Sequence, residues 1–329
     1  MTHIKKLFVA CLVVVMMLCG CRHTLQDQSD SSDKTELNQN FTKELSMVED
    51  ENNYYYIDKN IIYQKNKLSA TALQLYQHQT VNDSLSDLFV YDNHLYFFAT
   101  NQTPYFEIFR INLKLGDVEK VTDYSEITQN DDEFLHSCVY LDGKIYIQMS
   151  FKLYCYDIES KISEKLHDDV GNYQFYNGAL YFIDHAYRTF SIYKMDLETK
   201  KTEIVLGDGE WCEDKTKDKK LYKNFVFIGD IMFYYMRTPD GLYMYKDGKS
   251  TLISDNTDIN EFSLCEYQNE LYFVKNYDEM YILMKYNPSD QKSEEVAILE
   301  NYAGYGYNMI KNGRFYYKGE NNNLFYVEI

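Results

Sequence analysis

A short pattern of strand, tight turn and strand recurs along most of this chain and limits the possible folds more than any other feature. Its clearest copy covers residues 87–123, DLFVYDNHLYFFATNQTPYFEIFRINLKLGDVEKVTD. Two apolar runs flank Asp92 and Asn93, residue types that tolerate the left-handed backbone of a two-residue hairpin turn. Two further runs, FEIFRINL and VEKVT, surround a turn that contains Gly116. This copy therefore predicts four short antiparallel strands.

An aromatic residue in the second predicted strand marks each copy of the pattern. The marked positions are about 40 residues apart on average, which is typical of the four-stranded blades of a β-propeller. The strands contain continuous apolar runs such as MFYYM, and such runs indicate sheets buried on both faces. We therefore predict an all-β fold, a β-propeller of seven four-stranded blades, with six or eight blades as alternatives. The marked residues are Tyr63, Tyr96, Tyr146, Tyr181, Phe233, Tyr272 and Tyr316.

Residues 1–20 have the composition of a signal peptide. Lys5 and Lys6 precede the apolar run LFVACLVVVMML, which is too short for a membrane-spanning helix of about 20 residues. The run leads into CGC, and Leu18 together with these residues resembles the lipobox of bacterial lipoproteins. This resemblance implies that Cys21 is acylated and anchors the protein on the extracytoplasmic face of a bacterial membrane without crossing it. An ordinary secretory signal is the alternative.

Residues 21–50 are almost entirely polar until apolar residues return at 41–48. Such a segment cannot bury enough apolar surface to offset its conformational entropy, so we expect a flexible tether. The last repeat, residues 307–329, contains only three predicted strands. Because propeller rings avoid an unpaired blade edge, residues 41–48 could supply the missing strand. The propeller itself is predicted to cover residues 51–329.

The chain carries a formal net charge of −18 at pH 7. This excess of acidic residues argues against nucleic acid as a partner and against a basic patch that binds anionic lipid. It favours cations or cationic partners, or it serves solubility alone. We therefore expect contact with the membrane only through the N-terminal lipid.

Four cysteines follow Cys21 in the sequence. Cys138 and Cys265 occupy equivalent first-strand positions in different repeats, so they should lie beyond the Cα separation of about 7 Å that a disulfide allows. We predict that both are small buried hydrophobic residues. Pairing of Cys155 with Cys212 stays open. No Cys or His spacing supports a zinc site, and no metal or cofactor is predicted.

Two copies of the repeat, LYFFA…EIFRINLKLG and LYFID…SIYKMDLE, resemble the YWTD repeats of low-density-lipoprotein-receptor propellers. Tyr181 and Asp184 match the first strand of that repeat, and Arg110, Leu113 and Gly116 match the second. The chain also resembles bacterial lipoproteins that carry degenerate repeats of this kind. The resemblance implies a propeller, although YWTD propellers have six blades, and it transfers no binding residue.

No local catalytic motif is present: the sequence contains no GxSxG, P-loop, GxGxxG or HExxH pattern. We therefore expect a membrane-anchored binding or scaffold module for a protein, peptide or glycan, with no catalysis of its own. One alternative is a propeller hydrolase or lyase acting on polysaccharide, which two carboxylates about 5–10 Å apart at the mouth of the ring would favour. A second alternative is a structural subunit of an envelope assembly or transport complex.

Connectivity predicts where a ligand would bind. In an antiparallel four-stranded blade, the connections between second and third strands lie at the same end as the links between blades. In this sequence those connections are long and irregular, and binding residues usually sit on such loops. Aromatic residues and arginine are the expected interface anchors, unless they pack onto their own blades. The candidate ligand-binding residues are Tyr105, Tyr187, Arg188, Trp211, Arg237, Tyr277, Tyr302 and Tyr305.

Overall fold

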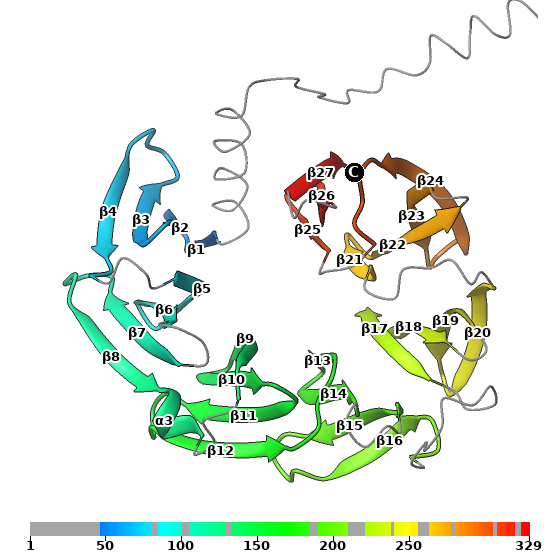
Figure 1. The fold of residues 1–329 in the computed structure, drawn as a ribbon, viewed down its shortest axis with the longest axis horizontal. Helices are drawn as coiled ribbons and strands as arrows, with labels where there is room; N and C mark the ends of the chain where they lie inside the picture. The colour runs from blue at the N-terminus through cyan, green and yellow to red at the C-terminus, as the bar shows by residue number, and fades with distance from the viewer. Residues whose placement is uncertain are drawn as a thin grey trace, which may run out of the picture. The chain divides into compact units, whose positions relative to one another are not determined.

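The computed structural model describes residues 47–79, 84–100, 105–128, 133–184, 190–209, 221–237, 240–255, 263–277, 280–304, 308–319 and 324–329. These residues form seven antiparallel sheets arranged as a β-propeller (Figure 1), within one compact unit that covers residues 39–329. Six sheets have four strands each, and the last sheet has three described strands. The predicted fold class and blade count are confirmed, and the count differs from the six blades of YWTD propellers.

The blades follow one another in chain order, and Figure 1 shows the first strand of a blade on its inner side and the fourth on its outer side. Blades 1 and 2 contain β1 (Val48–Glu49), β2 (Asn53–Asp58), β3 (Ile61–Asn66), β4 (Ala72–Gln77), β5 (Ser84–Tyr91), β6 (His94–Thr100), β7 (Phe106–Asn112) and β8 (Val118–Asp123). Blades 3 and 4 contain β9 (Leu135–Leu141), β10 (Lys144–Met149), β11 (Lys152–Asp157), β12 (Ile162–His167), β13 (Tyr173–Tyr176), β14 (Ala179–Ile183), β15 (Ile192–Asp196) and β16 (Thr202–Leu206).

Blade 5 contains β17 (Tyr222–Ile228), β18 (Ile231–Arg237), β19 (Asp240–Lys246) and β20 (Lys249–Ser254). Blades 6 and 7 contain β21 (Cys265–Tyr267), β22 (Glu270–Tyr277), β23 (Met280–Asn287), β24 (Lys292–Leu299), β25 (Met309–Lys311), β26 (Arg314–Lys318) and β27 (Leu324–Glu328). A four-residue helix, α3 (Tyr124–Ile127), lies in the link between blades 2 and 3. Among the described residues, no helix combines the length and the apolar composition that crossing a membrane requires.

Tight turns join the first and second strands in blades 2 to 7. Asp92 and Asn93 have φ angles of 44° and 58°, and a type I′ hairpin turn requires positive φ at both central residues. Blade 5 uses Gly229 at the first turn position instead, with a φ of 55°. The turn chemistry in the sequence therefore sets these hairpins locally. Two successive positive φ angles recur at Asp142 and Gly143, Asn177 and Gly178, Gln268 and Asn269, and Asn312 and Gly313.

In a blade that lies between two others along the chain, the second strand is buried on both faces, as its continuous apolar run predicts. In β6, Leu95 and Phe97 face blade 1, whereas Tyr96 and Phe98 face blade 3. Six such clusters join consecutive blades, from blades 1 and 2 to blades 6 and 7. Each large apolar side chain that becomes fully buried contributes about 1.5–3 kcal/mol, so these clusters dominate the stability of the propeller.

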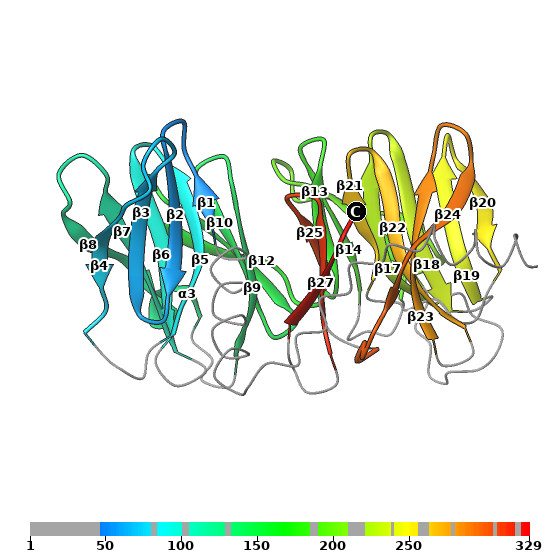
Figure 2. The ribbon, with the colours of Figure 1, turned by 90° about the horizontal axis from the view of Figure 1, so that it is seen from above.

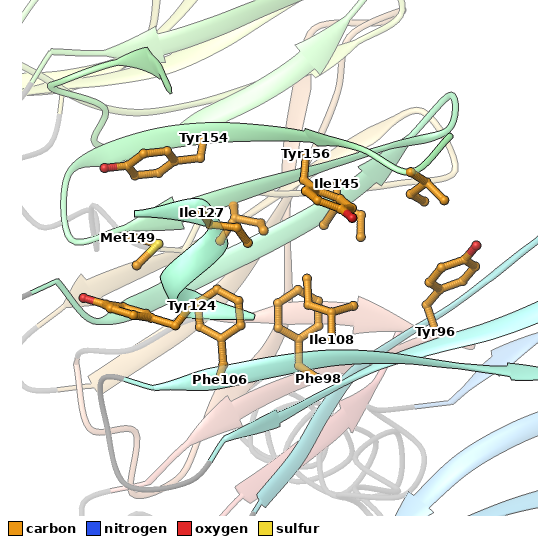
Figure 3. Packing of buried hydrophobic residues seen from close by; sticks show 12 residues of the cluster. Tyr96, Phe98, Phe106, Ile108, Tyr124, Ile127, Ile145, Met149, Tyr154 and Tyr156 are labelled. Carbon is orange, nitrogen blue, oxygen red and sulfur yellow. The ribbon is translucent and has the colours of Figure 1, made fainter. Parts of the chain in front are cut away.

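The cluster between blades 2 and 3 illustrates this packing. Figure 3 shows Phe98 and Ile108 of blade 2 opposite Ile145 and Tyr156 of blade 3. The Tyr156 hydroxyl donates a hydrogen bond to the Val121 carbonyl at 3.1 Å, so its polar atom is satisfied while the ring is buried. The Tyr-rich runs of the sequence therefore fill the space between blades.

The alignment of the first repeat is wrong by one strand. Tyr63 lies in β3, the third strand of blade 1, whereas the other marked aromatic residues lie in second strands. The cause is a two-residue turn at Lys59 and Asn60, with a φ of 59° at Lys59, which joins the second and third strands of this blade. The turn signal therefore marks a different hairpin in blade 1 than in the other blades.

Val48 is not part of a fourth strand of the last blade, which residues 41–48 could supply according to the sequence. Val48 lies in β1 and pairs with Tyr55 of β2, so it forms the first strand of blade 1. Residues 41–46 lie outside the described residues. The Lys311 ammonium of blade 7 donates a hydrogen bond to the Met47 carbonyl at 2.7 Å, so the last blade contacts the residue that precedes β1.

The described cysteines carry free thiols. Cys138 and Cys265 lie in the first strands β9 and β21, as predicted. Cys265 is buried, and burial raises its pKa to about 12, whereas Cys138 is half-buried. Cys155 is a free thiol as well, and it is buried in the cluster between blades 3 and 4. Cys212 lies outside the described residues.

Candidate functional site

The two ends of the blades are different surfaces. The turns between first and second strands and between third and fourth strands lie at one end, which we call the turn face, and Figure 2 shows these hairpins along its upper edge. The connections between second and third strands and the links between blades lie at the opposite end, which we call the loop face. The predicted binding residues that the structure describes lie at the loop face: Tyr105, Arg237, Tyr277 and Tyr302.

Three of the predicted binding residues are exposed on the loop face. The side chains of Tyr105 and Tyr277 are 50% and 54% exposed, and Arg237 is also exposed. The Tyr105 ring contacts the edge of the Tyr124 ring at a centroid distance of 5.2 Å. These residues belong to blades 2, 5 and 6, so the predicted set is spread over the face. Four further residues of the predicted set lie outside the described ranges: Tyr187, Arg188, Trp211 and Tyr305.

The prediction that Tyr302 is an exposed loop residue is wrong. Its side chain is 3% exposed, and its ring packs 4.8 Å from that of Tyr281 and 5.7 Å from that of Tyr317. The Asn308 amide donates to the Tyr302 hydroxyl at 2.8 Å, and burial raises the pKa of this phenol to about 12. The ring fills the space between blades 6 and 7, because it can bury its apolar body while its hydroxyl keeps a partner.

Two exposed aromatic residues of the loop face are absent from the predicted set. Phe134 precedes β9 and is 51% exposed, and Phe151 lies between β10 and β11 and is 44% exposed. The Ser150 amide donates to the Phe134 carbonyl at 2.8 Å, so the two segments lie side by side. We call Phe134 and Phe151 the phenylalanine patch. The available signal was an aromatic residue at Phe151, in a short connection where polar turn residues are usual.

A partly buried ion pair links the two segments of the phenylalanine patch. The Lys152 ammonium contacts one carboxylate oxygen of Glu133, and the side chains of these residues are 31% and 7% exposed. The hydroxyls of Thr128 and Tyr154 donate to the other oxygen at 3.1 and 3.0 Å. Glu133 adjoins Phe134 in sequence, and Lys152 adjoins Phe151. The ion pair therefore positions the backbone of both phenylalanines.

The electrostatics of this cluster keep it charged. The Glu133 carboxylate raises the pKa of the Lys152 ammonium above its ordinary value, so the lysine stays protonated at neutral pH. Figure 3 shows Tyr124, Met149 and Tyr154 at the same end of the cluster between blades 2 and 3, which gives the ion pair a packed support. These polar groups therefore bind one another next to the two exposed phenylalanines.

The acidic segment His167–Asp169 bonds to groups of its own blade. Asp168 accepts a hydrogen bond from Lys165 at 2.6 Å, and the His167 ring nitrogen accepts one from the Asp169 amide at 3.1 Å. Within the described ranges of the chain, no group of three or more His, Cys, Asp or Glu side chains could hold a metal ion.

The architecture defines a seven-bladed β-propeller with an aromatic loop face. No protein-family model matches the sequence, and no curated protein matches it either. Among solved structures, the chain is similar to a puromycin hydrolase mutant complexed with PGG, at 9% identity and a TM-score of 0.56, over 92% of this chain and 54% of that chain.

Two further solved structures are similar to this chain. Dipeptidyl peptidase 4 of Porphyromonas gingivalis matches at 12% identity and a TM-score of 0.54, over 84% of this chain and 48% of that chain. A chain of the mitotic checkpoint complex matches at 8% identity and a TM-score of 0.52, over 84% of both chains. The chain thus spans about half the length of the two hydrolytic enzymes. Identities this low establish the shared propeller fold alone.

Proposed function

We propose that this protein is a lipid-anchored extracytoplasmic binding module that recognises its ligand with the loop face of the propeller. The observation that carries the proposal is the distribution of exposed aromatic side chains. Tyr105, Phe134, Phe151 and Tyr277 are exposed at the loop face, whereas Tyr91 is the exposed aromatic residue of the described turn face. Aromatic side chains bury a large area at a small entropic cost, so a surface that exposes several of them is suited to binding.

The anchor rests on the sequence. The apolar run before LCGC and the polar segment that follows Cys21 are the arrangement expected of a lipoprotein signal and tether. A bacterial extracytoplasmic location follows from the same resemblance. A tether of this length would let the propeller present its loop face to a partner near the membrane.

The two parts of the proposal are tested separately, the anchor by cell fractionation and the binding face by substitutions. Wild-type protein and a Cys21→Ala variant are expressed in a bacterium and separated into membrane and soluble fractions. The proposal expects the wild type in the membrane fraction and the variant in the soluble fraction or unprocessed. A Cys21→Ala variant that stays in the membrane fraction at the mature mass would rule out the lipid anchor, and loss of ligand binding only through turn-face substitutions would rule out the binding face.

An enzymatic role on this propeller is the alternative. The fold similarity to puromycin hydrolase and to dipeptidyl peptidase 4 is the observation that favours it, although this chain spans about half of either chain. A polysaccharide hydrolase or lyase would belong to the same alternative. Turnover of a peptide or polysaccharide substrate by the purified chain, lost on substitution of a loop-face carboxylate, would replace the binding proposal.

A further inference from the structure

Exposed aliphatic side chains gather on one part of the turn face. Every turn of this face belongs to the residues that the structure describes. In the described turns of blades 4 to 7, no large apolar side chain is exposed. The exposed large aliphatic residues at or beside the turns of blades 1 to 3 are Leu68, Leu73, Leu115, Val118 and Ile162. All of them except Ile162 belong to blades 1 and 2, so the turn face has an apolar sector there.

The two most exposed of these residues lie in neighbouring hairpins. Leu68 is 98% exposed between β3 and β4, and Leu115 is 74% exposed between β7 and β8. We call these two turns the leucine tips, and Figure 2 shows both hairpins along its upper edge. Leu75 of β4 and Leu113 beside the second tip pack into the same cluster between blades 1 and 2. The leucine tips therefore lie at one end of the blades and at one boundary.

The turn geometry does not require leucine at these tips. The Leu115 amide donates a hydrogen bond to the Asn112 side-chain oxygen at 3.0 Å, and in blade 4 the Thr199 amide donates one to Asp196 at 2.7 Å. The same turn therefore carries leucine in blade 2 and threonine in blade 4. Burial within the propeller does not explain Leu115 either, because most of its side chain is exposed. Several such residues on one surface indicate a contact outside the propeller.

The Leu68 tip is preorganised, and its charges are compensated. The Lys67 amide donates to the Asn52 carbonyl at 2.8 Å, and the Leu68 amide donates to the Asn66 side-chain oxygen at 2.9 Å. The Lys67 ammonium pairs with the Glu49 carboxylate at 3.0 Å. A contact made by this tip would therefore be apolar, with a small entropic cost, and it would not need an anionic partner.

The first described residues of the chain also lie near the turn face. The Met47 carbonyl is bonded by Lys311, which ends β25 and adjoins the turn at residues 312–313. Only Val48 and Glu49 separate Met47 from the turn at residues 50–52. Residues 22–46 join this point to Cys21, and a flexible chain of this length spans about 25–30 Å on average. A membrane that holds Cys21 is therefore within reach of the turn face.

A lipid bilayer suits the leucine tips better than a folded protein does. Leucine is under-represented among the residues that dominate protein interfaces, where Trp, Tyr and Arg prevail. Protein interfaces also need close shape complementarity, which a fluid bilayer does not. Lys114 directly precedes Leu115, and a lysine can keep its ammonium among the lipid headgroups while an adjacent apolar side chain lies deeper.

We propose that Leu68 and Leu115 form a second membrane contact by inserting into the bilayer that holds the lipid on Cys21. The inference rests on the lipid anchor of the proposed function. It goes beyond the sequence prediction, in which the N-terminal lipid alone contacts the membrane. The contact orients the propeller, with the turn face towards the bilayer and the loop face directed away from it, open to a ligand.

The test measures the depth of each tip in the mature lipidated protein, reconstituted into phosphatidylcholine vesicles. All variants carry Trp211→Phe, because Trp211 is the single tryptophan of the chain. A tryptophan is then introduced by Leu68→Trp or by Leu115→Trp. Thr199→Trp is the matched control, since Thr199 has the position of Leu115 in the same turn of blade 4. Tyr277→Trp reports on the loop face. Fluorescence is compared between plain vesicles and vesicles whose phosphatidylcholine is brominated on its acyl chains.

We expect bromine to quench Leu68→Trp and Leu115→Trp about twofold or more, since apolar groups that lie in the membrane interface are buried by about 5–10 Å. Thr199→Trp and Tyr277→Trp should keep their intensity. Adding Leu68→Ser to Leu115→Trp should reduce the quenching, because one of the two insertions is lost. Circular dichroism of each variant should show the wild-type spectrum, since both leucines are exposed.

Several results would overturn the inference. Equal quenching of Leu115→Trp and Thr199→Trp, or no quenching at either leucine tip, on vesicles that retain the protein would reject the contact and keep the anchor. Quenching of Tyr277→Trp alone would reject both this contact and the loop-face proposal. Dimers of the detergent-solubilised protein that are lost on combining Leu68→Ser with Leu115→Ser would assign the tips to a second copy. Protein that leaves the vesicles would remove the anchor itself, which fractionation of Cys21→Ala tests independently.

Discussion

Blades that follow one another in the chain pack differently from the two faces at the ends of the series. We call these two faces, one on blade 1 and one on blade 7, the end faces, and the boundaries between consecutive blades the inner boundaries. Between blades 2 and 3, Phe98, Phe106 and Ile108 pack directly against apolar residues of the neighbouring blade. On the end face of blade 1, the rings of Tyr56 and Tyr63 stack at 5.4 Å, and both are only half-buried. Each repeat packs mainly against its neighbours in the chain, so an end face lacks one such neighbour and its residue types differ accordingly.

The end face of blade 7 is also aromatic and polar. The Arg314 guanidinium lies over the Tyr326 ring at 4.6 Å and bonds to Glu328 at 2.9 Å. Tyr316 lies on this same side of β26, opposite the side that carries Phe315 and Tyr317 into the cluster with blade 6. Tyrosine rings pack at both kinds of boundary, but Tyr56 and Tyr63 on the end face of blade 1 are only half-buried, whereas Phe98 and Ile108 between blades 2 and 3 are fully buried. We expect the boundary between the last and first blades to be the least stable of the propeller.

The largest effect should come from an inner boundary. Phe98 is fully buried between blades 2 and 3, so Phe98→Ala should lower the free energy of unfolding by about 3–5 kcal/mol. Tyr56→Ala, on the half-buried end face, should cost about 1–2 kcal/mol because less apolar surface is lost. Urea unfolding measures both values. Equal costs would show that the end face is packed as tightly as an inner boundary.

The ion pair at the loop-face end of the same inner boundary should come next. Lys152→Met leaves the Glu133 carboxylate buried without its cation, which should cost about 2–3 kcal/mol, less than for a fully buried pair because Lys152 is 31% exposed. The double variant Glu133→Gln with Lys152→Met should recover part of this loss. A single variant as stable as the wild type in urea would show that the pair does not hold these segments.

A pH-dependent contribution is expected in blade 1. The Asp50 carboxylate accepts hydrogen bonds from the Asn52 and Asn53 amides and from the Tyr55 hydroxyl, at 2.8, 2.7 and 2.6 Å. Burial opposes ionisation of Asp50, but these hydrogen bonds outweigh it and lower its pKa below 3.8. The ionised form is therefore stabilised in the folded state. This contribution is complete above the unfolded-state pKa and is lost as the pH falls through the lowered folded-state value.

The comparison that tests it uses Asp50→Asn. Near neutral pH the wild type should be more stable by about 1 kcal/mol, after allowance for solvent screening at this half-buried group. The difference should shrink as the pH falls below 3.8, and Phe98→Ala should show no such pH dependence. Thermal melts of both variants between pH 7 and strongly acidic conditions would check this, and a constant difference for Asp50→Asn would contradict it.

The smallest effect, close to zero, is expected for the shorter of two truncations before blade 1. Deleting residues 22–40 should leave the thermal midpoint nearly unchanged, because the deletion spares Met47 and Val48. Extending it through Val48 removes a strand pair with Tyr55 and the carbonyl that Lys311 bonds, so stability should fall by about 1–2 kcal/mol. Equal midpoints for the two truncations would show that β1 and the contact with blade 7 are unimportant.

The sequence by itself determined the fold class and the number of blades. Turn pairs such as Asp92 and Asn93 specify hairpins through their own backbone preferences. Leu95 and Tyr96 are buried on opposite faces of β6, as the continuous apolar run predicts, because a sheet exposed on one face would alternate apolar and polar residues. Both signals act over a few residues, so they can be recognised without knowledge of distant contacts. The exception in blade 1 arose where the same turn signal served another hairpin.

The tertiary structure alone decided which side chains form the candidate site. Loop position predicts that both Tyr302 and Tyr105 are exposed. Tyr302 is instead buried against Tyr281, whereas Tyr105 is half exposed. The pairing of Glu133 with Lys152 joins the segment that precedes β9 to the connection between β10 and β11. Exposure and pairing depend on how neighbouring blades pack and where the chain returns. These contacts join residues far apart in the sequence, and no local pattern of residue types encodes them.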